Sequence, residues 1–372
     1  MSKIITVYNH KGGVGKTTFT YNLAAKLAKE GKRVLVMDFD SQMNLTANLF
    51  GLNDTLCTFS AIQDEIEGKI EGFESITEGY ANTADMMQTC FSGDNYTKEP
   101  YTCTLKSIQK IANKSKKTTG NISSIDINII CGSLNIYGQE QVMQQNIISQ
   151  STFAIGLLYK KIREYAKNYD FVLVDCSPSA VSFTNAFLAL YADYLIVPVI
   201  PTYFCLQALR NLPDIIRMWQ SKLSRYDSVL GLPKMKFLGV VVNLANQYAD
   251  KKTKQTDKWV RDLNKAVHDL QQRLLNDQKS LTDQEFKSIF DGQTPFIIDH
   301  INNYTGNLRT AADLCGLPLT YISNYDIQKT LKTLDKPFIC NVSQGTYKEP
   351  YNETNEAYSR IANGLISRLQ QI

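Results

Sequence analysis

The chain carries the stretch Lys11-Gly12-Gly13-Val14-Gly15-Lys16-Thr17-Thr18 directly after an apolar run, Ile4 to Tyr8. A strand, a glycine-rich turn and the start of a helix bring backbone N–H groups and a positive helix end around a phosphate group. The spacing matches the loop G-x-x-x-x-G-K-[ST] except at the first glycine, where the chain has His10. The stretch therefore predicts a phosphate-binding loop of the deviant Walker A type.

The two lysines of this loop receive different predicted roles. Lys16 is expected to contact the β- and γ-phosphates of ATP, and Thr17 to bind Mg²⁺. Lys11 is poorly placed to reach its own loop's phosphates, so we expect it to act across a dimer interface, as a lysine counterpart of an arginine finger. The predicted ATP-binding residues are Gly12, Gly13, Val14, Gly15, Lys16, Thr17 and Thr18.

Three acidic residues follow apolar runs that read as strands. Val34–Met37 leads into Asp38 and Asp40, and Phe171–Val174 leads into Asp175. Mg²⁺ beside the phosphates prefers hard oxygen ligands, so Asp175 is predicted to be the Walker B carboxylate and Asp38 to support the metal shell. Asp40 is the candidate that orients the attacking water. The alternative for Asp38 and Asp40 is a helix cap or a solvated loop charge.

Alternation of short apolar runs with amphipathic helical stretches predicts the fold class. We expect an α/β P-loop NTPase with a mainly parallel twisted sheet and helices on both faces. Predicted strands are Ile4–Tyr8, Val34–Met37, Asp126–Cys131, Phe171–Val174, Tyr194–Val199 and Phe237–Asn243, and predicted helices are Thr17–Lys29, Ser151–Asn168, Ser182–Tyr191 and Cys205–Leu223.

Two ranges interrupt this alternation within what we expect to be a single domain, residues 1–372. Residues 53–124 are polar and weakly periodic, which predicts an insertion of short helices and loops. Residues 245–293 carry Trp259, Leu263 and Val267 at helical spacing, continued by Leu270 and Leu274, with Lys and Arg on the other face. This second range predicts an added amphipathic helical segment.

Composition narrows the class of protein further. The 372 residues carry a net charge of +4, which permits contact with nucleic acid. The eight cysteines include no C-x-x-C pair, which is typical of free thiols in a reducing cytoplasm and disfavours a metal or iron–sulfur site. The chain shows no signal peptide and no apolar run long enough to span a membrane, so we expect a cytoplasmic protein without stable membrane insertion.

Four stretches together resemble the ParA/Soj partition ATPases of the ParA/MinD family. They are KGGVGKTT, VLVMDFDSQMNLT, FVLVDCSPS and LIVPVIPTYFCLQAL, and similarity extends over about residues 2–52, 125–245 and 295–370. Ser41 stands where the family usually has Pro, Met43 where it usually has Gly, and Ser177-Pro178 where it usually has a double Pro after the Walker B Asp. These departures leave hydrolysis plausible, whereas the two insertions put the partner surface in doubt.

The resemblance implies a cycle in which ATP clamps two protomers into a homodimer, the dimer binds DNA without sequence preference, and hydrolysis releases it. It also implies a ParB-like adaptor protein, a nucleoid-associated location, and an adenine-side position for Asn243, which could instead be a strand-end cap.

The predicted DNA contacts lie in a basic region. Between Arg210 and Lys279 the sequence has 14 basic residues and 7 acidic ones, and Lys251, Lys252 and Lys254 form a cluster. A solvated lysine-coated helix is the alternative for these residues. Two other functions stay open: a MinD-like membrane-cycling regulator, which would use the C-terminal helix around Ile361 and Leu365, and an ATP-switched scaffold in a multi-protein system.

Overall fold

The computed structural model describes residues 2–50, 79–110, 120–148, 152–230, 235–244, 254–290, 296–302, 317–322 and 347–369, with the single residues 308, 312, 315 and 326. Its centre is one sheet whose strands run in the order β3-β4-β2-β5-β1-β6-β7-β8. Their bounds are β1 Lys3–Val7, β2 Val34–Phe39, β3 Tyr101–Lys110, β4 Gly120–Ile130, β5 Phe171–Cys176, β6 Tyr194–Val199, β7 Lys236–Leu244 and β8 Ile297–Asn302.

Strands β2, β5 and β6 are buried along their whole length, because helices cover both faces of the sheet. This explains why they read as continuous apolar runs rather than alternating ones. All neighbouring strands pair in parallel except β3 and β4, which form an antiparallel pair at one edge. The predicted fold class, a mainly parallel α/β sheet of the P-loop NTPase type, is confirmed.

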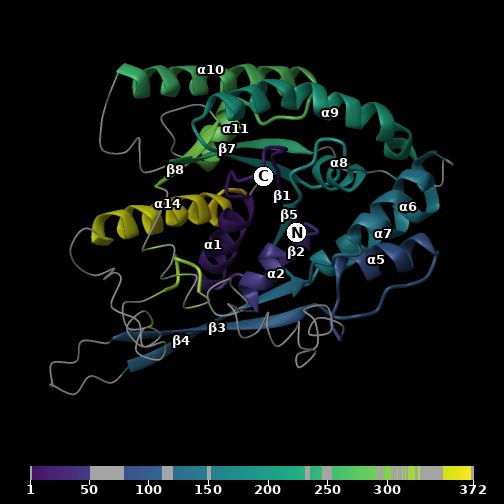
Figure 1. Cartoon of the computed structure of the whole chain (residues 1–372), viewed down its shortest axis with the longest axis horizontal. Helices are drawn as coiled ribbons and strands as arrows, with labels where there is room; N and C mark the ends of the chain where they lie inside the picture. The colour runs from purple at the N-terminus through teal and green to yellow at the C-terminus, as the bar shows by residue number, and fades with distance from the viewer. Residues whose placement is uncertain are drawn as a thin grey trace, which may run out of the picture.

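The helices form two groups, one on each side of the sheet (Figure 1). In one group α14 contacts α1, α11 and β8, while α1 contacts β2, β4 and β5. In the other, contacts pass from α5 through α6, α7 and α8 to α9 and α10. The bounds are α1 Lys16–Lys29, α2 Asn44–Leu49, α5 Thr83–Phe91, α6 Ile136–Ile148, α7 Thr152–Ala166, α8 Phe183–Leu190, α9 Tyr203–Leu230, α10 Lys254–Asn276, α11 Asp283–Ile289 and α14 Lys348–Ser367.

The strand order places the candidate site. Strand β1 lies between β5 and β6, and β2 lies on the far side of β5. In open parallel sheets ligands bind at the carboxyl ends of the strands, beside the point where the strand order reverses. The phosphate loop follows β1 there, and Asp38 and Asp175 occupy paired positions on neighbouring strands β2 and β5.

Residues 53–124 contain more sheet than the sequence indicated. In the described part of this range lie α5, all of β3 and the start of β4, so the expectation of short helices and loops missed a strand of the main sheet. The missed strand, Tyr101–Lys110, mixes Thr, Lys, Ser and Gln with few apolar residues. An edge strand needs apolar side chains on one face only, which weakens its sequence signal.

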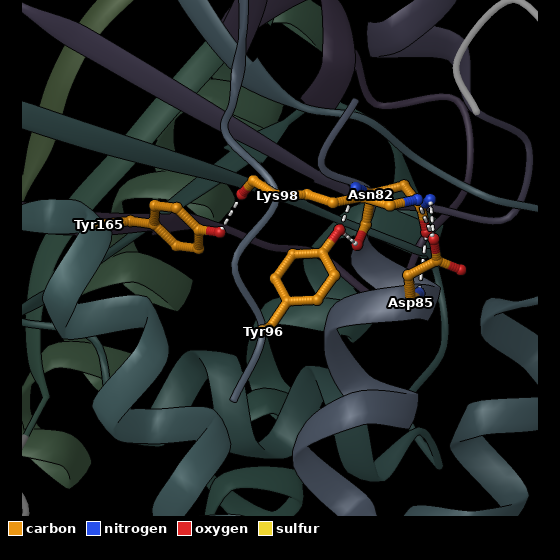
Figure 2. Close-up of polar contacts among 5 residues, drawn as sticks. All are labelled: Asn82, Asp85, Tyr96, Lys98 and Tyr165. Atoms are coloured by element: carbon orange, nitrogen blue, oxygen red, sulfur yellow. Dashed lines mark hydrogen bonds and ion pairs between the residues drawn. The ribbon is translucent and has the colours of Figure 1, made fainter. Parts of the chain in front are cut away.

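Side-chain hydrogen bonds fix the chain between α5 and β3 (Figure 2). The Tyr96 hydroxyl accepts a hydrogen bond from the backbone N–H of Asn82 at 2.9 Å, and Lys98 forms an ion pair with Asp85 at 2.9 Å. The Tyr165 hydroxyl on α7 donates to the backbone carbonyl of Lys98. These contacts tie the segment to α5 and α7.

Helices α10 and α14 bury their apolar faces. On α10, Leu263, Val267, Leu270 and Leu274 are buried, and the helix lies alongside α9 (Figure 1). On α14, Ile361 and Leu365 are buried in the core, so this face is occupied by the protein itself. Among the described helices, none combines the length and the apolar composition that crossing a membrane requires.

Candidate nucleotide-binding site

The phosphate loop adopts backbone conformations that need glycine. Gly13 and Gly15 have φ values of 72° and 85°, in the left-handed region where a Cβ is strained. Gly15 directly precedes α1, and a Cβ there would lie 2.8 Å from Nδ2 of Asn243. Only glycine fits this position without displacing Asn243.

Two asparagines hold the loop, one just after β1 and one on β7. Asn243, near the end of β7, donates a hydrogen bond from Nδ2 to the carbonyl of Val14 at 2.6 Å. Asn9 donates to the Pro198 carbonyl at 2.8 Å, and its Oδ1 accepts from the backbone N–H of Lys11 at 2.9 Å. Asn243 thus contacts the loop, and its adenine-side role stays a prediction.

Lys16, Thr17 and Asp175 meet below the loop. Thr17 Oγ1 donates to Asp175 Oδ2 at 2.7 Å, and Oδ1 of Asp175 is buried without a hydrogen-bond partner among the described residues. Burial, followed by the nearby Asp38 carboxylate, raises the pKa of Asp175, while burial lowers the pKa of Lys16. A hydroxyl and a carboxylate with a free buried oxygen suit Mg²⁺, which prefers hard oxygen ligands.

Asp38 is fully buried and holds the loop that follows it. Its Oδ2 accepts hydrogen bonds from N and Oγ1 of Thr46, at 2.9 and 2.8 Å, and its Oδ1 accepts from the Asp40 N–H at 3.1 Å. Burial raises the pKa of Asp38 to about 6, although these hydrogen bonds favour the charged form. In the structure Asp38 positions residues 40–46, and its part in the metal shell stays a prediction.

Asp40 lies at the start of that loop. Its Oδ1 accepts from the Gln42 N–H at 3.0 Å, and the side chain is buried. Met43 follows with φ of 53°, which accounts for the glycine usual at this position of the family. Met43 is itself buried, and its Cγ lies 3.0 Å from where a Cβ of Gly132 would stand. The departure at residue 43 therefore replaces a glycine by a packed side chain.

The side chain of Lys11 lies beside α9. Its Nζ lies 5.9 Å from the ring centre of Phe204, at the start of α9. Lys11, His10, Phe204 and Asn211 are among the residues that line a cavity of about 360 Å³. The proposed action of Lys11 across a dimer interface stays a prediction.

The predicted DNA contacts are not placed by the structure. Lys251 and Lys252 lie outside the described residues, and Lys254 is described only as the first residue of α10. Further along α10, Lys258, Arg261 and Lys265 are exposed, on the side away from the buried leucines.

The sheet, the loop and the acidic pair define a P-loop NTPase. A protein-family model described as "AAA domain" matches residues 2–227, more than half of the chain. The chain belongs to this family, and its relatives confirm the resemblance to the ParA/Soj proteins of the ParA/MinD family.

Two curated relatives illustrate the relationship. The chain is 29% identical to "Sporulation initiation inhibitor protein Soj" of Bacillus subtilis over 228 residues, which are 60% of this chain and 68% of the relative. It is 26% identical to "Chromosome partitioning protein ParA" of Myxococcus xanthus over 251 residues, 67% of this chain and 68% of the relative.

Solved structures share the fold over almost the whole chain. "Structure of pNOB8 ParA bound to nonspecific DNA" aligns with a TM-score of 0.52 and 19% identity, covering 100% of this chain and 99% of that one. The ATP complex of Cyanothece McdA aligns with a TM-score of 0.52 and 14% identity, covering 96% of both chains. At these identities the likeness concerns the fold.

Sequence reasoning missed several residues that shape the site. Thr46 ends the stretch VLVMDFDSQMNLT, but the motif does not predict its bonds to Asp38, which depend on how α2 packs. Tyr8 and Trp219 gave no signal, because an aromatic residue at a strand end or within a helix usually indicates core.

Proposed function

We propose that the protein binds Mg·ATP and hydrolyses it slowly as a ParA-type ATPase acting in DNA partition. The observation that carries this proposal is the hydrogen bond from Thr17 to Asp175 beneath a glycine-rich loop, beside the buried Lys16. The names of the relatives, a chromosome partitioning protein among them, support the same reading.

Each residue has a role that its position supports. Backbone N–H groups of residues 12–18 and the Lys16 ammonium group would neutralise the phosphate oxygens. Thr17 and Asp175 would hold Mg²⁺, which supplies further neutralisation of the charge that develops on the leaving group. Asp40 is expected to orient the attacking water. Because Asp40 is far from the phosphate loop in the sequence, its position beside the phosphates depends on how residues 40–46 fold.

Isothermal titration with Mg·ATP tests binding, and phosphate release measured in parallel tests turnover. We expect both in the wild-type protein and neither with Lys16→Ala. Normal turnover by Lys16→Ala would contradict the assignment of the loop.

An ATP-dependent homodimer is supported by an exposed apolar face at the carboxyl edge of the sheet. Its side chains are between 60% and 77% exposed in the single chain, and they follow β4, β5 and β6 as Leu134, Tyr137, Val181, Tyr203 and Phe204. Because the phosphate loop opens at the same edge, a second copy of the chain that covers this face would meet Lys11.

Two variants separate the contributions to the dimer. Lys11→Ala should leave ATP binding by the monomer largely intact but weaken the ATP-dependent dimer, measured by analytical ultracentrifugation. Phe204→Glu should also weaken the dimer, whereas Met218→Glu, further along the same helix, serves as its control. Equal loss of ATP affinity in Lys11→Ala and Lys16→Ala would contradict action across the interface.

Binding of DNA without sequence preference is supported by the exposed basic residues of α10, Lys258, Arg261 and Lys265. Phosphate contacts require charge and no base reading, and a dimer doubles their number. The related pNOB8 ParA is titled as bound to nonspecific DNA. Binding of this kind would associate the protein with the nucleoid.

Fluorescence anisotropy with duplexes of unrelated sequence tests this proposal. Binding should require ATP and fall steeply with salt. Reversal of Lys251, Lys252 and Lys254 to Glu, or of Lys258, Arg261 and Lys265, should weaken it at unchanged ATP affinity. Reversal of three exposed lysines, Lys106 on β3, Lys160 on α7 and Lys167 just after α7, provides a control of equal charge. Binding that resists both the α10 reversal and high salt would contradict the proposal.

A ParB-like adaptor protein is the expected partner, and an affinity pull-down with ATP present is the test. Enrichment of a DNA-binding protein that raises the rate of ATP hydrolysis would support partition. Enrichment of proteins that leave the rate unchanged would favour the ATP-switched scaffold.

A further inference from the structure

The segment that follows Asp175 is held by side chains from three helices or strands. Asn185 on α8 donates from Nδ2 to the carbonyls of Ser177 and Ser179, each at 2.9 Å. The Tyr8 hydroxyl, at the end of β1, donates to the Ser179 carbonyl at 3.0 Å. Trp219 on α9 donates from Nε1 to the Ala180 carbonyl at 2.9 Å.

Tyr8 and Trp219 also contact one another. Their ring centroids are 5.1 Å apart with an interplanar angle of 63°, and both side chains are buried. Tyr8 begins the chain segment that becomes the phosphate loop. The aromatic pair therefore links the end of the strand that leads into the phosphate loop to the segment that follows the proposed metal ligand Asp175.

Helix α9, which carries Trp219, also contacts the nucleotide site and α10. At its start, Phe204 lies under the Nζ of Lys11. In its middle, two residues before Trp219 is Arg217, which forms an ion pair with Asp277, just beyond α10, at 2.8 Å. Asp214 on α9 is paired with Arg273 on α10. A shift of α9 therefore moves groups at the nucleotide site and along α10 together.

We propose that Tyr8 and Trp219 are positioning residues that clamp segment 177–180, and that through Trp219 this clamp couples occupancy of the nucleotide site to α9. The inference rests on the proposed ATP-binding function. Its physical basis is that two buried side chains donate to adjacent carbonyls, those of Ser179 and Ala180, so a displacement of the segment after Asp175 acts directly on Trp219. Removing the Trp219 donor takes away the side-chain partner of the Ala180 carbonyl, and removing the Tyr8 hydroxyl leaves the Ser179 carbonyl bonded to Asn185 alone. Either change weakens the hold on the segment and frees it to take other positions.

Tryptophan fluorescence gives a direct measurement, because the chain has two tryptophans, Trp219 and Trp259. The Trp259→Phe variant leaves Trp219 as the single reporter. We expect Mg·ATP to shift its emission, with a midpoint that matches the dissociation constant from isothermal titration, and a smaller shift when Tyr8→Phe is added. Bound ATP with unchanged Trp219 emission would overturn the coupling. Absence of ATP binding in the wild-type protein would overturn the proposed function, and the inference with it.

Kinetics separate positioning from a merely structural role. Tyr8→Phe and Trp219→Phe should each lower kcat about tenfold and change the KM for ATP by less than about twofold. Tyr191→Phe is the matched control, since its buried hydroxyl donates to the Leu223 carbonyl of α9 at 3.0 Å, away from segment 177–180. We expect Tyr8→Phe and Tyr191→Phe to lower the melting temperature by similar amounts and only Tyr8→Phe to lower kcat. Equal kcat in the two variants would overturn the role of Tyr8.

Discussion

Thr17 on α1 and Asp175 at the end of β5 are joined by a hydrogen bond of 2.7 Å between Oγ1 and Oδ2. The bond links two segments that are 158 residues apart. It brings next to each other the hydroxyl and the carboxylate that are proposed to hold Mg²⁺.

Lys16→Met is expected to abolish ATP binding without destabilising the free protein. Lys16 is 7% exposed, and its burial lowers the pKa of the ammonium group, which means that the charged form is unfavourable there. Thermal melting without ligand should show an equal or higher melting temperature than the wild type. A large decrease would show that Lys16 stabilises the empty site.

Asp40→Ala is expected to trap an ATP-bound dimer. Without the carboxylate that orients water, hydrolysis should fall by about 10²-fold or more while the phosphate contacts remain. Size-exclusion chromatography with ATP measures the dimer, and Asp94→Ala, an exposed acidic residue remote from the loop, is the control. An Asp40→Ala protein that stays monomeric at micromolar concentration contradicts the assignment.

Asn243→Ala should weaken ATP binding because it removes the hydrogen bond to the Val14 carbonyl. We also expect the free energy of unfolding to fall by about 1 kcal/mol. Gly15→Ala should be more severe, since its new methyl group meets Asn243 Nδ2 at 2.8 Å and its φ is 85°. The double variant relieves the clash but not the backbone strain, so it should not regain the ATP affinity of Asn243→Ala. Full recovery would show that the clash alone requires glycine.

Met43→Gly and Met43→Ala should destabilise the protein to different extents. Both lose a buried side chain, which for Met→Ala costs roughly 2–5 kcal/mol. Glycine relieves the left-handed backbone at φ of 53°, which is unfavourable by about 1–2 kcal/mol for other residues. Urea unfolding should therefore rank Met43→Gly above Met43→Ala in stability. The reverse order would contradict strain at this position.

His10 should make the free protein less stable as the pH falls. Burial, followed by the charge of Lys16, lowers the pKa of His10 below its ordinary value. The unfolded chain therefore binds a proton in the range just below pH 6.5 that the folded chain does not, and stability is lost as the pH falls through that range. Urea unfolding at pH 7.5 and 5.5 should show a smaller pH effect in His10→Gln, with His268→Gln, an exposed histidine, as the control. Equal pH effects in both variants would contradict the assignment.

The strongest local patterns in the sequence were sufficient to predict the fold class. KGGVGKTT after a strand, and strands that end in Asp38 and Asp175, predict a P-loop sheet because phosphate binding restricts the backbone between residues 12 and 18 to a few conformations. Central strands such as β5 are buried on both faces, so their apolar runs are unambiguous. Strands β3 and β8 were missed, since strands at the ends of the sheet need fewer apolar residues.

By itself, then, the sequence determined the class of fold, the phosphate loop and the three acidic candidates, since each depends on residues within one strand and the turn after it. Only the tertiary structure decided which residues these side chains contact. It directs Asp38 to Thr46, places Asn243 against Val14, points Lys11 toward Phe204 and brings Tyr8 onto Trp219. The physical reason is that each of these pairs joins segments from different elements, whose separation is set by how strands order and helices pack and by nothing local to either residue.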